Sequence, residues 1–479
     1  MASCVTIFHM NQEQELTNRS LSGIFKSFML NEVPSYANKI YYSLGFLSAT
    51  SLIVLIASGF VLVFNGPDWW LSTAAGTYTR SVHLWATQAF IFFILLHLLI
   101  VFLTSGYKAS RRLTWVLGSL MFFAALVEAE FGYGLRGDFS SQWRALQASD
   151  LYNGSGLGAF INNINYAQIY GIHIIIIPLF ILIILFLHYT LVKVRGLAKP
   201  FKQDVKFRVV KANHTVLFSR GIVLVAVILI LASFFKSPLI LPTTIKSVAQ
   251  MNPALVAKTL VAEVNKTSDT ATYSDSIDPY TYDTAAVYVG IPFSEYVQSN
   301  GAVNTWTLFN DQPIPVQSRE LSFASQYFDN NGPLNVSSTS SIIATVSVLT
   351  NMAQSGLYEA SLRAQTAGDN RTYVTRFIAD TGVLDAKAKE LGMTTEQYGM
   401  LHEEKGAIPP GAWWLAPIGF LDQTILANDP NQDRDGAEIL GLLVFLLIAF
   451  PYIPYINRIP EKIGADRFIW KDKSIEIEK

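Results

Sequence analysis

The sequence predicts an all-α integral membrane protein with six membrane-spanning helices and a large polar insert between the fifth and the sixth. Of its 479 residues, 51% are apolar, and the mean hydropathy is +0.32. This is too apolar for an ordinary soluble protein of this size. Six runs reach the roughly 20 residues that cross a bilayer. They span about residues 43–64, 86–104, 114–131, 171–193, 219–240 and 437–457.

Changes in composition divide the chain into six parts. We expect an N-terminal segment, a four-span domain, a basic linker with the fifth span, a polar insert, the sixth span and a C-terminal tail. Their respective bounds are 1–32, 33–200, 201–242, 243–436, 437–457 and 458–479. Within the insert, periodicity predicts helices over 341–365 and 383–392 and suggests strands over 282–293 and 304–309.

Lys and Arg in the short loops predict the orientation of the chain. The segments 105–112 and 193–211 are basic, so they and both termini should be cytoplasmic, with the insert on the opposite side. The single cysteine, Cys4, excludes an internal disulfide, and this chain alone lacks the thiolates for an iron–sulfur cluster or c-type haem attachment. A net charge of −1 gives no reason to expect a nucleic-acid partner.

Four of the seven histidines lie in or beside two predicted spans, where an ionisable group is costly and marks a functional candidate. His97 follows His83 by fourteen positions on the second span, and His188 follows His173 by fifteen on the fourth. At a rise of about 1.5 Å and a turn of about 100° per residue, these spacings climb about 21–22 Å and return to one broad helix face. Each helix therefore presents two imidazoles at two depths.

The second and fourth spans run in the same direction, so His83 should face His173 and His97 should face His188. Two histidines facing each other across an apolar cleft can provide both axial ligands of a haem iron. The alternative is a set of core histidines bonded to hydroxyl or backbone groups. Two matched pairs on parallel helices favour a four-helix dihaem bundle, in which two haem b groups form an electron pathway across the membrane.

Glycines repeat at the spacing of the first histidine pair on the other two helices of this bundle. Gly59 follows Gly45 by fourteen positions on the first span, and Gly132 follows Gly118 by the same interval on the third. Small residues in spans more often serve helix–helix contacts. Here, two flat haem macrocycles, one at each level of the bundle, would need neighbouring helix positions without side chains at both levels.

Two arginines are candidate partners of haem propionates, because a guanidinium suits a carboxylate. They are Arg80 and Arg111, and the alternative for each is anchoring at the membrane surface. Pro178 should kink the fourth span, because it cannot donate a backbone hydrogen bond.

Three stretches closely resemble the cytochrome b/b6 family, the core of quinol–cytochrome c or plastocyanin oxidoreductases. They are RSVHLWATQ…LLH, FLTSGYKASRRLTWVLG and YGIHIIIIPLFILIILFLH, within a resemblance that covers about residues 33–200. The wider histidine spacing of the fourth span resembles the b6-type branch. A weaker resemblance links the fifth span, IPPGAWWLAPIGFLDQ and the sixth span to the start of the family's C-terminal half.

The resemblance implies roles for these residues. His83 and His173 would ligate an outer, low-potential haem b, and His97 and His188 an inner, high-potential one. Quinol or quinone would be the substrate. The haem contacts carried over from the family are Arg80, Arg111, Gly45, Gly59, Gly118 and Gly132.

The resemblance also bears on Ser43, and the three remaining histidines are judged by their place relative to the spans. In the b6 branch a cysteine before the first helix holds an extra haem, but Ser43 stands at that place, so no such haem is expected. His9, His214 and His402 lie outside the spans and are assigned no ligand role. His214 lies on the expected inner side, where a quinone site is possible.

Two motifs that shape the family's outer quinol site are altered. PEWY, whose glutamate takes a quinol proton, is PGAWW here, with Ala412 at the place of the glutamate. GYxLPWDQ is GYGLRGDFSSQ, with Arg136 in place of proline. An alanine accepts no proton. Either another acid acts, such as Asp138 or Asp422, or quinol oxidation at this site is modified or lost, and no catalytic residue can be named.

The resemblance implies the dihaem b subunit of a bc-type quinol oxidoreductase, in an energy-conserving membrane of bacterial or archaeal type. The expected partners are a Rieske iron–sulfur protein and/or a c-type cytochrome, in a dimeric hetero-oligomeric complex with a possible further subunit supplying C-terminal helices. The altered motifs favour an alternative, a dihaem conduit between the quinone pool and an extracytoplasmic redox protein docked on the insert. A haem-free scaffold or receptor is the third possibility.

Overall fold

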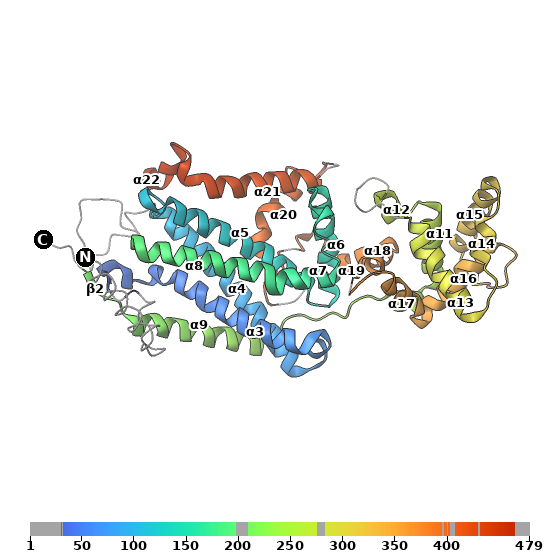
Figure 1. Ribbon diagram of the computed structural model, residues 1–479, viewed down its shortest axis with the longest axis horizontal. Coiled ribbons are helices and arrows are strands. Elements are labelled where there is room, and N and C mark those ends of the chain that lie inside the picture. The colour runs from blue at the N-terminus through green and yellow to red at the C-terminus, as the bar shows by residue number, and fades with distance from the viewer. Residues whose placement is uncertain are drawn as a thin grey trace, which may run out of the picture.

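The computed structural model places a bundle of long apolar helices at one end of an elongated molecule and a cluster of short helices at the other (Figure 1). It describes residues 30, 32–197, 209–274, 283–368, 370–394, 397–399, 401–402, 408–429 and 432–464. Most of the predicted N-terminal segment, 1–32, and much of the tail, 458–479, lie outside the described residues.

Six helices in the described part of the chain are long and apolar enough to cross a membrane, as the sequence predicts. The prediction of an all-α membrane protein is therefore confirmed. The helices are α3 (Leu44–Ser72), α4 (Ala74–Leu103), α5 (Arg112–Gly134), the run of α7 (Tyr166–Gly171), η5 (Ile172–Ile176) and α8 (Ile177–Arg195), α9 (His214–Phe234), and α21 (Gln432–Ala449).

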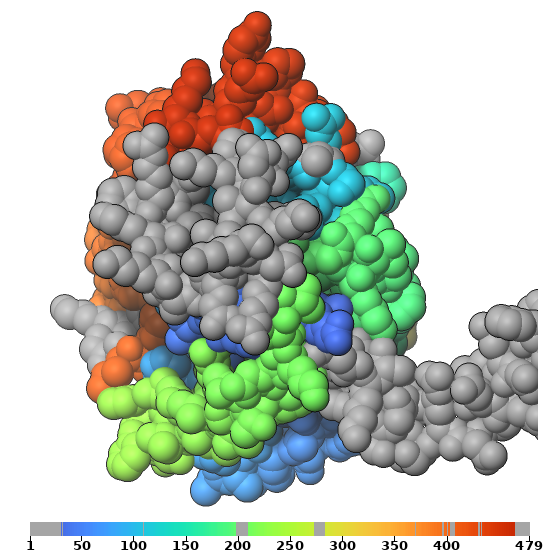
Figure 2. Space-filling view, turned by 90° about the vertical axis from the view of Figure 1, so that its left-hand side faces the viewer, coloured from blue at the N-terminus to red at the C-terminus, as the bar shows by residue number. Residues whose placement is uncertain are grey.

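The far end of the bundle closes with short elements. Strands β1 (Glu32–Pro34) and β2 (Val209–Lys211) pair antiparallel and form the only sheet in the described residues. In the end-on view of Figure 2, α9 lies beside α3, and α22 (Ile459–Ile463) lies at the opposite edge.

The structure corrects the predicted start of the second span. Helix α4 begins at Ala74 rather than at 86, and most of 66–80, expected to be a loop, is helical. Helix α3 is kinked at Gly66, whose φ of 75° favours glycine. The break between α3 and α4 is at Thr73, whose side chain accepts a hydrogen bond from the Gly76 amide at 3.0 Å and so caps α4.

The fourth span widens where proline interrupts it. Pro178 has no amide hydrogen to donate to the carbonyl four residues earlier. The chain instead forms a π-turn, η5, over Ile172–Ile176. Such wide turns are rare inside α-helices, and those that occur are often found at functional sites. This one contains His173.

The polar insert folds mainly as a compact helical domain, which we define as residues 245–393. Its central helix, α16, buries Ile342, Ile343, Val346 and Leu349. The other helices are α10 (Ile245–Met251), α11 (Pro253–Asn265), α12 (Asp269–Ser274), α13 (Ile291–Asn300), α14 (Thr305–Asn310), α15 (Ile314–Asp329), α16 itself (Ser341–Ser355), α17 (Leu357–Ala364), α18 (Thr372–Asp380) and α19 (Val383–Glu390).

The predicted helices of the insert are confirmed, but the predicted strands are wrong. The stretch 283–293 forms a π-turn (Ala286–Gly290) that leads into α13, and 304–309 lies mostly in α14. Short apolar runs do not distinguish a strand from a buried helix by periodicity. The Asn304 side chain accepts from the Thr307 amide at 3.0 Å and so caps α14, a helix-start signal.

Helix α6 (Phe139–Gly154) joins the bundle to the helical domain. Phe139 and Trp143 are buried in the domain's own hydrophobic core, and the Trp143 indole donates to the Met393 carbonyl at 2.9 Å. Gln142 and Thr243 exchange two hydrogen bonds of 2.8 Å. A shared core of this kind holds the two parts together as a continuous structure.

The insert does not end as one unit at 436. Residues 408–429 return to the bundle, where η8 (Trp413–Leu415) and α20 (Ala416–Gln423) lie (Figure 1). Ala412 and Trp414 are buried against α4 and α5. This return segment therefore belongs to the membrane bundle in space.

Two carboxyl groups are buried together inside the helical domain. The Ser268 hydroxyl donates to Glu263 at 2.7 Å, and the Thr270 amide donates to Asp380 at 3.0 Å. Burial and the neighbouring Asp380 raise the pKa of Glu263 from 4.5 to about 9, and burial also raises the pKa of Asp380. At neutral pH the folded domain thus holds a proton that the unfolded chain has already lost.

We predict that the domain loses stability as pH rises from about 5 to about 9. In this window the unfolded Glu263 carboxyl is ionised while the folded one stays protonated, which costs about 1.4 kcal/mol per pH unit. Thermal unfolding of the full chain in detergent, measured across this range, should show the decline. Glu263→Gln should flatten it, whereas the exposed Glu390→Gln should not. Stability that rises with pH would contradict the prediction.

Candidate cofactor site

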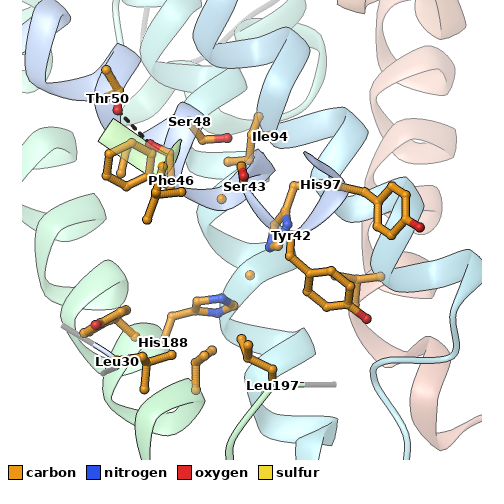
Figure 3. Close-up of a pocket in the computed structure, with 18 of the residues that line it drawn as sticks. Leu30, Tyr42, Ser43, Phe46, Ser48, Thr50, Ile94, His97, His188 and Leu197 are labelled. Atoms are coloured by element: carbon orange, nitrogen blue, oxygen red, sulfur yellow. Dashed lines mark hydrogen bonds between the residues drawn. The ribbon is translucent and has the colours of Figure 1, made fainter. Parts of the chain in front are cut away.

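The four predicted histidines form two pairs at two levels of the bundle. The domain-side pair, His83 and His173, lies toward the helical domain, and its ring centres are 6.3 Å apart with the planes at 71°. The distal pair, His97 and His188, lies toward the other end. In Figure 3 the two distal rings point toward each other across a cavity. Helix α4 supplies one ring of each pair, and the α7–α8 run supplies the other.

The π-turn explains the unequal histidine spacings on these two helices. An i→i+5 turn takes up more residues than an i→i+4 turn. The π-turn η5 contains His173, so the fifteen positions from His173 to His188 cover the same helix length as about fourteen positions of a regular α-helix. This matches the fourteen positions between His83 and His97. Both helices present their two rings at corresponding depths.

Each predicted glycine packs against one of the four imidazoles. A Cβ atom at Gly132 would lie 2.9 Å from His173 Cε1, closer than real Cβ contacts. The same construction gives 3.2 Å from Gly118 to His188, 3.4 Å from Gly59 to His83 and 3.5 Å from Gly45 to His97. The histidines themselves therefore require little or no side chain at these positions.

Backbone carbonyls of α5 orient the two rings of the α7–α8 run. His188 Nδ1 lies 3.1 Å from the Thr114 carbonyl oxygen, and His173 Nδ1 lies 3.1 Å from the Glu128 carbonyl oxygen. Thr114 and Glu128 repeat at the same interval as the two glycines of α5, and each stands four positions before one of them. A carbonyl acceptor favours a proton on Nδ1, which leaves Nε2 free as a metal ligand.

The Ser58 hydroxyl orients the ring of His83 in the same way. The Ser58 hydroxyl donates to the Val54 carbonyl at 2.7 Å, and its oxygen lies 2.9 Å from His83 Nδ1. The oxygen can then accept the Nδ1 proton, and Nε2 again remains available. The three oriented rings are thus prepared for coordination through the same nitrogen atom.

A carboxyl group that the sequence analysis did not single out also contacts a histidine. Glu128 Oε1 lies 3.1 Å from His173 Nδ1, in addition to the backbone contact. Two sequence signals were available. Glu128 is an ionisable residue inside a span, and it stands four residues before Gly132 on the same face of α5.

The two predicted arginines occupy different surroundings. Arg111 lies on the wall of the distal cavity and donates to the carbonyl oxygens of Arg195 and Leu197 at 3.2 and 2.7 Å. Arg80 is buried, with its guanidinium 3.4 Å from an Asp138 carboxylate oxygen and hydrogen-bonded to the Pro238 carbonyl.

Neither predicted substitute for the PEWY glutamate is placed as a free acid beside Ala412. Asp138 is fully buried, pairs with Arg136 at 2.9 Å and with Arg80, and accepts from the Ser141 amide at 3.0 Å to cap α6. Asp422 belongs to α20 and lies near Gly436, so it faces the start of α21. The Asp138 carboxylate is therefore engaged in ion pairs and in capping α6.

The PGAWW segment packs tightly on the bundle near the domain-side pair. The Gln88 amide of α4 donates to the Pro410 carbonyl at 2.9 Å and accepts from the Trp413 indole at 2.7 Å. Ala412 is 2% exposed and shares a cluster with Tyr133 and Trp414. Apolar and aromatic groups thus fill the space that Ala412 faces.

The distal pair opens on a cavity of about 1140 Å³ (Figure 3). Its lining is mainly apolar and includes His97, His188, Arg111, His214 and Arg220. Small-molecule sites typically measure about 300–1,000 Å³. The cavity exceeds that range, so it has room for a large cofactor and for a second ligand beside it.

Comparisons with known proteins agree with the resemblance seen in the sequence. Cytochrome b6 from Auxenochlorella protothecoides is 25% identical over 194 residues, and that from Heterocapsa triquetra is 27% identical over 194 residues. Each alignment covers 35% of this chain and 88% of the relative. Among solved structures, a chain of a hyperthermophilic respiratory complex III aligns with 93% of this chain and 99% of its own length, at a TM-score of 0.40 and 15% identity.

The family model described as cytochrome b (N-terminal)/b6/petB matches residues 88–258. The match begins in α4 and includes α5, which carries Gly118 and Gly132, and the α7–α8 run, which carries His173 and His188. Over these residues the membrane bundle is thus similar to the cytochrome b/b6 family.

Proposed function

We propose that this protein is the dihaem b subunit of a membrane-bound quinol oxidoreductase complex. In this role it carries electrons across the membrane between quinol or quinone and a redox partner. The observation that carries the proposal is the domain-side pair, whose rings face each other at 6.3 Å. His83 and His173 would hold one haem b, and His97 and His188 would hold the other.

The ring separation fits an iron bound between two imidazoles. Two metal–nitrogen bonds of about 2.0 Å, with about 1.1 Å from each nitrogen to its ring centre, give about 6.2 Å. Bound between two histidines, haem iron supplies one-electron transfer. The chain's own residues orient the rings through Ser58, Thr114 and Glu128, and the glycines keep the rings accessible.

The distal cavity supports an inner quinone site next to the distal haem. Beyond the two histidines, the cavity wall carries His214 and Arg220, polar groups suited to a quinone carbonyl. Arg111, on the same wall, is the candidate for a propionate contact. Arg80 is already paired with Asp138, so a propionate would compete with that carboxylate.

Basic segments support the orientation of the complex. Lys108, Arg112, Lys193 and Arg195 lie at or just before the start of α5 and at the end of α8, and by the positive-inside rule this end of the bundle would be cytoplasmic. The helical domain would then face the opposite compartment, where a Rieske protein or c-type cytochrome could dock.

A second candidate function is a dihaem conduit without ordinary quinol oxidation at the domain side. It is favoured by Ala412, which is buried and cannot accept a proton, and by Asp138, which is paired with two arginines. In that case an extracytoplasmic redox protein docked on the helical domain would exchange electrons with the quinone pool through the two haems.

Replacing a distal histidine tests the haem assignment. His188→Leu should remove one of two haems and leave the other, because the domain-side ligands are unchanged. Haem content and redox titration of the purified protein measure this. His214→Leu, which alters the same cavity wall without touching a proposed ligand, should retain both haems. A haem-free wild-type protein would end the proposal.

The glycines provide a second test. Gly132→Ala should lower the occupancy of the domain-side haem, because its methyl group would displace His173. Gly59→Ala is the matched variant, since its Cβ would lie at an ordinary 3.4 Å from His83. We expect a clearly larger haem loss for Gly132→Ala, measured by absorbance per protein. Equal losses would mean that the histidine contact is not the reason for Gly132.

Isolation of the native complex separates the two candidate functions. The subunit of a bc-type complex should co-purify with a Rieske protein and respond to inhibitors of outer-site quinol oxidation. A conduit should co-purify with a different redox protein and be insensitive to those inhibitors. Mass spectrometry of the complex and inhibitor titrations provide the two measurements.

A further inference from the structure

The four proposed iron ligands differ in what their Nδ1 atoms face. His188 Nδ1 contacts the Thr114 carbonyl, and His83 Nδ1 contacts the Ser58 hydroxyl. His173 Nδ1 instead lies 3.1 Å from both the carbonyl oxygen and the Oε1 atom of Glu128. One histidine thus has a carboxyl group as a partner where these others have neutral acceptors.

The position of this carboxyl group is defined by the repeat on α5. Thr114 and Glu128 occupy equivalent places, each four residues before a glycine that receives an imidazole. The backbone contact is the same at both levels, at 3.1 Å. The contact between Thr114 and His188 can therefore be compared directly with that between Glu128 and His173 on the same helix. The two contacts differ in the side-chain carboxyl group of Glu128.

The contact lies inside the bundle rather than on its surface. The side chains of His173 and Glu128 are each 18% exposed, and Glu128 Oε2 is buried with no hydrogen-bond partner among the described residues. In surroundings of low dielectric constant, a hydrogen bond to a charged acceptor is stronger than one to a neutral acceptor. Oε1 therefore adds a carboxyl acceptor for the Nδ1 proton beside the backbone carbonyl, both at 3.1 Å.

We propose that Glu128 is a positioning residue that lowers the reduction potential of the domain-side haem; this rests on the dihaem function proposed above. A carboxylate that accepts the Nδ1 proton makes Nε2 a stronger donor to the metal. It also places negative charge beside the iron, and both effects favour the ferric over the ferrous state. One electron enters or leaves the iron, and no bond is formed or broken.

The expected effect is confined to one level of the bundle. The place equivalent to Glu128 beside the distal pair is Thr114, whose side chain carries no carboxylate. The Glu128 side chain would therefore shift the potential of the domain-side haem and leave that of the distal haem unchanged.

Redox titration of Glu128→Gln in the purified full-length protein is the test. We expect the variant to retain two haems per chain. The lower of the two potentials should rise by at least about 59 mV, which for one electron is a tenfold change in the ferrous/ferric equilibrium constant. The higher potential should be unchanged. The low-spin EPR signal of the domain-side ferric iron should shift with it. Glu128→Ala, which retains the backbone acceptor, should show the same rise.

Glu130→Gln is the matched control. It removes a carboxylate two residues away on the same helix, one that accepts a hydrogen bond from the Asn163 amide at 3.4 Å. Its effect on either potential should be less than half that of Glu128→Gln. Equal shifts in the two variants, unchanged potentials in Glu128→Gln, or loss of the domain-side haem from both Glu128 variants would each overturn the proposal. A wild-type protein without haem would instead refute the proposed function.

Discussion

The close approach of four imidazole rings to the backbones of α3 and α5 determines how the bundle is built. Each ring lies where a glycine leaves room, and at Gly132 even a methyl group would overlap the ring. On α5, the same geometry brings Nδ1 to a carbonyl oxygen four residues earlier. One repeat, a carbonyl followed after four residues by a glycine, thus fixes the helix spacing and the orientation of the rings together.

The second organising feature is α6, whose apolar side completes the core of the helical domain. Because Phe139 and Trp143 are buried in that core and Trp143 is bonded to Met393, the domain is not attached only by its two linkers. Asp138 caps the same helix while pairing with Arg80 of α4. The buried charges therefore connect the histidine-bearing helix, α6 and the domain. This explains why a residue at a family quinol motif has a structural role here.

Periodicity was sufficient to predict the spans, the histidine pairs and the glycine levels, because each depends on spacing along a single helix. It failed where tertiary contacts decide. The apolar run before α13 resembles a strand but is buried as a helix. The partner of Arg80 lies on a different helix, far along the sequence at Asp138. Two sequence signals marked Glu128, its charge inside a span and its place four residues before Gly132, but no spacing rule indicates that its side chain turns toward His173.

The π-turn in the fourth span has a consequence for how such a bundle tolerates change along its sequence. A helix that absorbs one additional residue in a single wide turn keeps every later side chain in phase with its neighbours. Here the turn spans Ile172–Ile176, at the first of the two rings. A one-residue difference between the histidine spacings of the two helices therefore leaves the rings paired at both levels, because the extra length is taken up within that one turn.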